Sequence, residues 1–181
     1  DAAIAGMSIV SRIMMFANSA LIGFGQGFQP VCGFNYGAKR YQRVLDSFWF
    51  CVKVAFGVLV VMAVAVYAAA PNLVALFRKG DAEVIAVGTA ALRYSVVVFP
   101  LSAWIIMCNM MLQSIGKGLK ASIVASARQG IFFLPLIAIL PHFFGLPGVE
   151  MCQAVSDIFA LTVSIPLVIT RASKLSFWLL R

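Results

Sequence analysis

Five apolar stretches, each of about 20 residues or more, constrain the fold more than any other feature of the sequence. A stretch of this length can cross the hydrocarbon core of a membrane, where the backbone must satisfy its own hydrogen bonds. None of the stretches alternates between polar and apolar residues as a barrel strand does, so each predicts a transmembrane helix. The sequence therefore predicts one all-α, polytopic domain over residues 1–181, with spans near 4–31, 48–70, 87–113, 121–144 and 149–170.

Composition excludes several other classes of protein. The chain is 62% hydrophobic and 11% charged, so its net charge of +8 leaves too few polar residues for the basic, water-facing surface of a nucleic-acid-binding protein. The four cysteines lie in or beside apolar runs, without CxxC spacing, and indicate neither a disulfide framework nor a metal site. The single histidine, His142, lies in a predicted outer loop without a paired nucleophile, which argues against an enzyme.

The basic residues orient the predicted spans. Arg78 and Lys79 are the only cationic loop residues on one side of a five-span zigzag. The other side holds Lys39, Arg40, Arg43, Lys117, Lys120, Arg171, Lys174 and Arg181. By the positive-inside rule, the sequence predicts a multi-pass protein of the plasma (inner) membrane, with its N-terminus outside and its C-terminus in the cytoplasm.

A glycine-rich segment, GFGQGFQPVCGFNYGAKRYQR at residues 23–43, joins the first two spans. Its spacing fits neither a dinucleotide fingerprint nor a P-loop. Gly23 and Gly27 form a G-x-x-x-G pair, which predicts close packing against another helix. The residues expected to stop the helix and turn the chain in the cytoplasm are Pro30, Gly33, Asn35 and Gly37.

Polar residues recur at helical spacing inside four of the five spans, while the second span has only Lys53 and is expected to pack or to face lipid. The candidate transport-pathway residues are Arg12, Ser19, Gln26, Gln29, Asn109, Gln113, Arg128, Gln129, Gln153 and Asp157. Residues seven apart share a helix face, and polar groups within lipid usually face a bundle interior or a water-filled cavity. These stripes indicate either a transport path or hydrogen bonds between helices.

Three charges lie deep within the predicted spans: Arg12, Arg128 and Asp157. Each costs roughly 2.5–3.5 kcal/mol at a helix centre, so each needs a partner or a polar path. Arg12 and Asp157 each lie eight residues inside the outer end of a span, which predicts an ion pair at a shared depth. The alternative is that Asp157 takes up a coupling proton or lines the substrate path.

Residues 23–44, together with FPLSAWIIMCNMMLQSIGKG, ARQGIFFLPLIAIL and GLPGVEMCQAVSD, make the chain resemble multidrug and toxic compound extrusion (MATE) transporters. The resemblance covers nearly the whole chain. It implies helices eight to twelve of a twelve-helix, two-lobe protein, with the N-terminal lobe missing; the opening DAAIAGMS also indicates a fragment. Asp157 matches the acid of the family's final motif, whereas Glu150, Cys152 and Ala154 depart from it.

The resemblance implies an ion-coupled antiporter that exports amphipathic, cationic organic compounds by alternating access. Its expected partners are the lipid bilayer, such substrates and the missing lobe, with no nucleic acid. No cofactor is implied beyond a coupling ion, H+ or Na+, and Asn109 stands on the helix where some members carry a coupling acid. The alternatives are a lipid-linked sugar flippase of the same superfamily and a structural membrane-assembly protein.

Overall fold

A computed structural model describes residues 2–77, 82–126, 130–131, 133–144, 152 and 155–166. These residues form helices and a few turns, with no strand among them, which confirms the predicted all-α class. The helices are α1 (Ala2–Gly37), α2 (Tyr41–Phe77), α3 (Ala82–Val98), α4 (Leu101–Ser114), α5 (Gly118–Ser126), α6 (Phe133–Phe144) and a further helix at Val155–Pro166.

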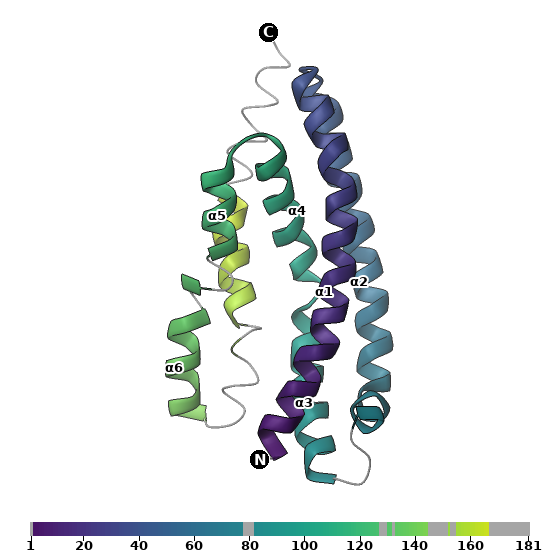
Figure 1. Ribbon diagram of the computed structural model, residues 1–181, viewed down its shortest axis with the longest axis vertical. Helices are drawn as coiled ribbons and strands as arrows, with labels where there is room; N and C mark the ends of the chain where they lie inside the picture. The colour runs from purple at the N-terminus through teal and green to yellow at the C-terminus, as the bar shows by residue number, and fades with distance from the viewer. Residues whose placement is uncertain are drawn as a thin grey trace.

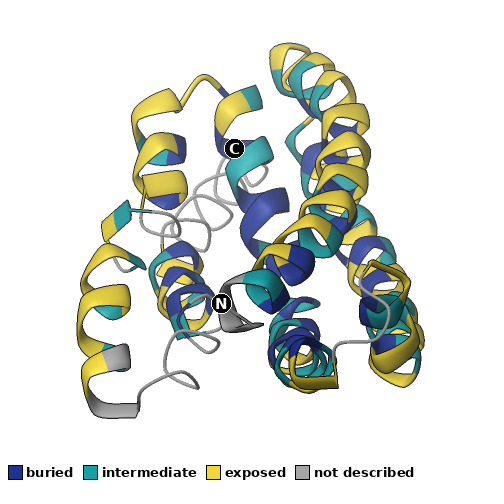
Figure 2. Cartoon of the chain, turned by 60° about the horizontal axis from the view of Figure 1, so that its bottom comes forward, coloured by how far each residue is buried: buried dark blue, intermediate teal, exposed yellow. Residues whose placement is uncertain are grey.

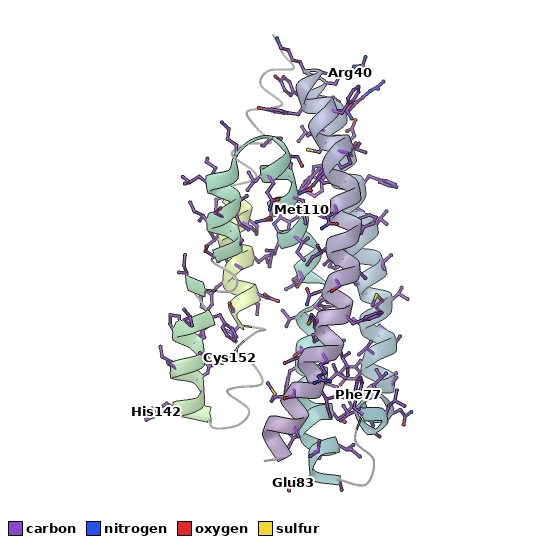
Figure 3. The ribbon with its side chains drawn as sticks, viewed as in Figure 1. Arg40, Phe77, Glu83, Met110, His142 and Cys152 are labelled. Carbon is purple, nitrogen blue, oxygen red and sulfur yellow. The ribbon has the colours of Figure 1, made fainter. Side chains whose placement is uncertain are left out.

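The two longest helices, α1 and α2, run side by side along the length of the molecule (Figure 1). Both α3 and α4 pack against this pair, and α5 packs against α4. The α1–α2 and α4–α5 turns point toward one end of the bundle (Figure 1). Arg40 lies at that end, whereas Glu83 and His142 lie at the other (Figure 3). The basic turn residues Lys39, Arg40 and Lys117 therefore share an end, as the predicted orientation requires.

Pro30 and Gly33 do not stop the first helix, contrary to the prediction. Pro30 lies inside α1, which continues to Gly37. A proline removes one backbone donor, and a helix tolerates that loss where its neighbours hold it in place. The turn that follows places Lys39 in the left-handed region, at a φ of 58°, and the Arg40 amide donates to the Asn35 carbonyl over 2.9 Å.

The predicted third span is broken in two. α3 and α4 meet at Phe99 and Pro100 with a bend of 53°. Pro100 has no N–H for the carbonyl of Val96, so the regular helical hydrogen bonding is interrupted there. α1 and α2 are each long and apolar enough to cross a membrane, and the bent pair makes a third span if its halves count as one. The fourth and fifth predicted spans include residues outside the described ranges.

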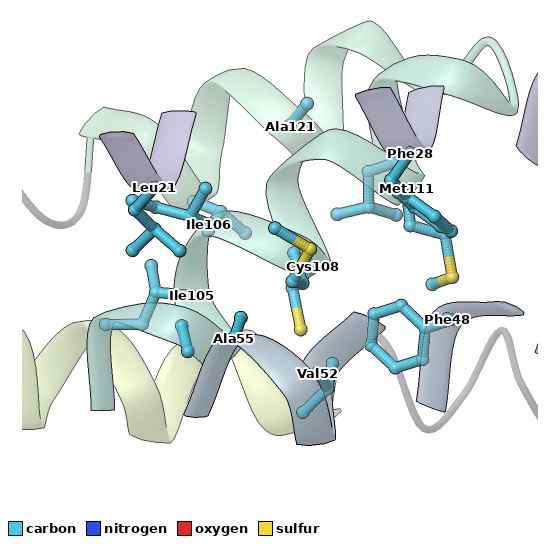
Figure 4. Close-up of a cluster of buried hydrophobic side chains, with 14 of the residues drawn as sticks. Leu21, Phe28, Phe48, Val52, Ala55, Ile105, Ile106, Cys108, Met111 and Ala121 are labelled. Carbon is cyan, nitrogen blue, oxygen red and sulfur yellow. The ribbon is translucent and has the colours of Figure 1, made fainter. Parts of the chain in front are cut away.

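Buried residues occur on most of the helices (Figure 2), and their apolar side chains form two clusters. The larger joins α1, α2, α4 and α5 through residues that include Phe28, Phe48, Cys108 and Met111 (Figure 4). The smaller joins α1, α2 and α3 near Val74 and Val84. All four cysteines are free.

Candidate functional site

A chain of side-chain amides, partly exposed, links α1, α4 and α5. Gln29 Nε2 on α1 donates to Gln113 Oε1 on α4 over 3.1 Å. Gln113 Nε2 donates in turn to Asn109 Oδ1, and Asn109 Nδ2 donates to the Ala121 carbonyl on α5 over 2.7 Å. Each amide both donates and accepts except at the ends, so three helices are held in one register by polar contacts.

The amide chain fixes the orientation of Asn109. Its Oδ1 accepts from Gln113 while its Nδ2 donates to Ala121, so the two ends of the amide cannot be exchanged without breaking both contacts. Gln29 Nε2 also lies 2.9 Å from the sulfur of Met110. One N–H of Asn109 remains for another acceptor.

Asn109 also lines a cavity of about 200 Å³ between α1, α4 and α5. The other lining residues are Ile22, Ile105, Ile106, Met110, Val124 and Ala125. An apolar wall with one oriented amide suits a flat apolar group that carries a hydrogen-bonding atom. The volume is below the roughly 300–1,000 Å³ of pockets for drug-sized molecules, so this cavity could hold part of such a molecule. Met110 gives the wall an adaptable side chain.

Asp157 forms a second polar site at the break between α3 and α4. It lies on the Val155–Pro166 helix and is 5% exposed. Ser102 Oγ, in the first turn of α4, lies 3.4 Å from Asp157 Oδ2, a long hydrogen bond. Further along the same two helices, Trp104 Nε1 donates to Ser164 Oγ over 3.1 Å. A buried carboxylate thus lies beside a helix break, with polar contacts joining the two helices.

The structure brings together only part of the predicted polar set. Gln29, Asn109 and Gln113 form the amide chain described above. Three residues on α1 are exposed instead: Arg12, Ser19 and Gln26. The Ser19 hydroxyl donates to the carbonyl of Met15, within its own helix. Arg128, Gln129 and Gln153 lie outside the described residues.

The predicted ion pair between Arg12 and Asp157 is wrong. Arg12 is exposed on α1, whereas Asp157 is buried beside Ser102 of α4. Equal depth in two helices does not fix how either helix is rotated about its axis, and here one side chain faces outward while the other faces into the bundle. Asp157 therefore has a setting in the bundle that does not depend on Arg12.

No described helix makes the close contact predicted for the G-x-x-x-G pair. A Cβ added at Gly23 or at Gly27 would meet nothing within 4 Å. The glycine between them, Gly25, faces Met107, whose Cε would lie 3.1 Å from an added Cβ. Gly33 is looser, since the Ser114 carbonyl oxygen would lie 3.9 Å away.

Two helix backbones also approach each other closely at glycines that no sequence motif marks. A Cβ at Gly6 of α1 would lie 3.1 Å from the Gly88 nitrogen of α3 and 3.4 Å from the Val84 carbonyl oxygen. A Cβ at Gly88 would lie 2.9 Å from a methyl carbon of Val74 on α2. Three helices therefore meet at a point where only glycine fits.

We expect the amide chain to respond non-additively to mutation. Gln113→Leu leaves Gln29 with only its contact to the Met110 sulfur and removes the donor to Asn109 Oδ1, so it should lower the free energy of unfolding by about 0.6–1.7 kcal/mol. Adding Gln29→Leu removes one stranded partner, so the double variant should lose little more than the single. Thermal unfolding of the purified full-length protein measures both. Losses that simply add would contradict a shared chain.

Together, the apolar helices, the amide chain between three of them and the buried carboxylate at a helix break define an α-helical integral membrane protein with polar contacts between its helices. The MatE family model matches residues 1–139, which is most of the chain. The chain belongs to the MatE family.

Curated relatives agree with this assignment. The multidrug export protein MepA of Staphylococcus aureus (strain MSSA476) is 29% identical over 149 residues, which cover 81% of this chain and 32% of MepA. MepA of Staphylococcus haemolyticus (strain JCSC1435) is 27% identical over 147 residues, with the same two shares. The chain thus spans about a third of the length of these relatives.

Solved structures show the same fold. An outward-facing multidrug resistance MATE family transporter superposes with a TM-score of 0.88 at 24% identity, over 96% of this chain and 39% of that one. An inward-facing MATE family transporter also superposes with a TM-score of 0.88, at 22% identity, over 97% of this chain and 42% of that one. The described helices therefore have the arrangement of one part of a MATE transporter.

Proposed function

We propose that the chain is the C-terminal lobe of an ion-coupled multidrug exporter that works by alternating access. Membership of the MatE family carries the proposal, and the relatives named as multidrug export proteins support it. The lobe matches outward-facing and inward-facing transporters equally well, at 0.88 in each case. That equality favours a lobe that keeps its internal arrangement while it moves against the rest of the protein.

The proposed substrates are amphipathic, cationic organic compounds, and the α1–α4–α5 cavity is a place where an apolar part of one could lodge. Among the residues that the structure describes, its lining is apolar apart from Asn109 and includes no cationic side chain. A flippase for lipid-linked sugars would need clustered basic residues for its pyrophosphate, so the lining favours the exporter. Since its MatE relatives are transporters, transport is also favoured over catalysis and over a purely structural role.

Asp157 is the proposed group through which H+ or Na+ acts in this lobe. It is the buried acid of the described residues, and a carboxylate within a membrane segment is costly unless it serves a pathway or a partner. Its position beside the α3–α4 break resembles the broken helices that form ion sites in other transporters. The ion whose gradient drives efflux identifies which of the two acts on Asp157.

The proposed orientation puts the Arg40 end of the bundle in the cytoplasm and the His142 end outside. Single cysteines in a background without the four native ones test it. Tyr36→Cys and His142→Cys should label with an impermeant maleimide from opposite sides of sealed vesicles. Labelling of both from one side would contradict the orientation and the span order behind it.

The full-length protein in proteoliposomes provides the test of function. An inward H+ or Na+ gradient should drive efflux of a cationic dye, and collapsing the gradient with an ionophore should stop it. The matched control is the same protein with the gradient absent from the start. Gradient-independent dye movement, or none from protein with a normal unfolding transition, would contradict the proposal.

A further inference from the structure

A cation is stacked on an aromatic ring where α2 and α3 meet. The guanidinium carbon of Arg93, on α3, lies 5.0 Å from the centroid of the Tyr67 ring on α2. Tyr67 is 46% exposed and part of the Arg93 side chain is exposed too, so the stacked pair lies at the surface of the described bundle. The ring attracts the charge but accepts no hydrogen bond in the plane of the guanidinium.

Two polar atoms beside this pair have no hydrogen-bond partner among the described residues. They are Nε of Arg93 and Oγ1 of Thr89, and both are buried. Thr89 precedes Arg93 by four residues, so the two side chains share a face of α3. Leaving such donors unpaired is costly, and an anionic oxygen forms the strongest hydrogen bonds with a guanidinium. The pair therefore has the chemistry of an anion site.

The depth of the pair in the membrane indicates which anion it meets. Tyr67 lies ten residues from the end of α2 at Phe77, and Arg93 lies eleven residues from the start of α3, about 15 Å and 16 Å along the axes. α2 is about 55 Å long, so a centred hydrocarbon core of about 30 Å leaves about 12 Å of helix at each end. The pair thus lies near the core boundary, where arginine and tyrosine side chains reach lipid headgroups. Phe77 and Glu83 place this boundary toward the His142 end of the bundle (Figure 3).

Exposed apolar side chains continue from the pair toward the centre of the membrane. On α2, Val64 and Val60 precede Tyr67 by three and seven residues, so they share its face, and both are exposed. On α3, Val97 follows Arg93 by four residues and is also exposed. Because α2 and α3 pack against each other, these valines lie on neighbouring helices below one polar group. This arrangement suits a molecule with an anionic head and apolar chains.

We infer that Arg93 and Thr89 bind the phosphate of an anionic phospholipid, whose acyl chains lie along Val64 and Val97. The guanidinium donates to the phosphate oxygens, and stacking on Tyr67 holds it in place. Thr89 supplies a hydroxyl one turn away. The exposed valines favour a lipid over a carboxylate from the rest of the polypeptide. Since the lipid contacts both α2 and α3, its binding stabilises the folded protein.

Thermal unfolding of the full-length protein in detergent tests the site. Dioctanoyl phosphatidylglycerol should raise the midpoint of the delipidated protein, and the titration gives a Kd. Arg93→Gln removes a charged hydrogen bond, so it should weaken binding by about tenfold or more. The matched control is Lys53→Gln, which removes another exposed cation about 21 Å along α2 from Tyr67 and should leave the Kd unchanged. Equal Kd values for the two variants would overturn the inference.

Two substitutions of the ring test the stacking. Tyr67→Phe keeps the ring and should keep the affinity, whereas Tyr67→Leu should weaken binding by about threefold. Equal affinities in these two variants would contradict the role of the ring.

Other ligands separate an anionic lipid from other sources of the acceptor. Dioctanoyl phosphatidylcholine has no net charge and glycerol 1-phosphate has no acyl chains, so each should raise the midpoint much less than phosphatidylglycerol does. An equal rise with either would overturn the inference. Without added lipid, Arg93→Gln should keep the parent midpoint, because it removes an unpaired donor. A fall of the midpoint there would show that Arg93 pairs with an acidic side chain of the polypeptide, and would equally overturn the inference.

Discussion

Gly88→Leu is expected to lower the thermal midpoint of the full-length protein and its folded yield more than a leucine at an open glycine. The new Cβ would lie 2.9 Å from a Val74 methyl, and the α1 backbone at Gly6 lies 3.6 Å away. Valine is short and stiff, so neither neighbour can move aside without shifting its helix. Overpacking of this kind costs about 1–3 kcal/mol, and more where backbone must move.

The control for this prediction is Gly57→Leu on the exposed face of α2. An added Cβ there meets nothing within 4 Å, so the midpoint should change little. Gly6→Leu should behave as Gly88→Leu does, because its Cβ would meet Gly88 backbone at 3.1 Å. Differential scanning fluorimetry of all three variants decides the matter. Equal midpoints for Gly88→Leu and Gly57→Leu would show that α1, α2 and α3 do not meet at these glycines.

Asp157→Asn is expected to abolish gradient-driven efflux while leaving the protein folded. Asparagine has nearly the same shape and can still accept from the Ser102 hydroxyl, but it can neither take up and release a proton nor supply a negative charge for Na+. Efflux in proteoliposomes should fall to the level seen without a gradient. Folded yield and thermal midpoint should stay close to those of the parent protein.

Two further variants separate this role from a structural one. Ser102→Ala removes the hydroxyl contact but keeps the acid, so efflux should persist with at most a modest loss. Arg12→Gln should not rescue Asp157→Asn, since Arg12 is exposed on α1 whereas Asp157 is buried beside Ser102. Full driven efflux in Asp157→Asn would contradict the coupling role. A large loss of folded yield in Asp157→Asn would instead show that Asp157 has a structural role.

Apolar length alone predicts the helices, because lipid forces the backbone to bond within each segment. It does not predict where they end or break. Pro30 and Pro71 lie inside long helices, whereas Pro100 marks a bend of 53°. The three prolines remove the same donor, so the difference comes from how neighbouring helices hold the chain on each side. Whether a proline bends its helix therefore depends on tertiary packing and cannot be predicted from the local sequence.

The seven-residue spacing predicts which polar residues share a helix face, and the shared exposure of Arg12, Ser19 and Gln26 agrees with it. It does not predict what each face meets. The spacing could not show that Gln29 and Gln113 would bond, nor that Asp157 would face Ser102 rather than Arg12. Those contacts depend on helix rotation, which side chains far apart in sequence decide.

Spin-label distances in the full-length protein test the central claim most directly, namely that these helices move together as one lobe. Labels at Val61 of α2 and Leu119 of α5, both exposed, measure the distance between two helices within the lobe. A second pair joins Val61 to a site outside residues 1–181. We predict that changing pH or Na+ shifts the second distance and leaves the first unchanged. A first distance that changes as much as the second would contradict the account.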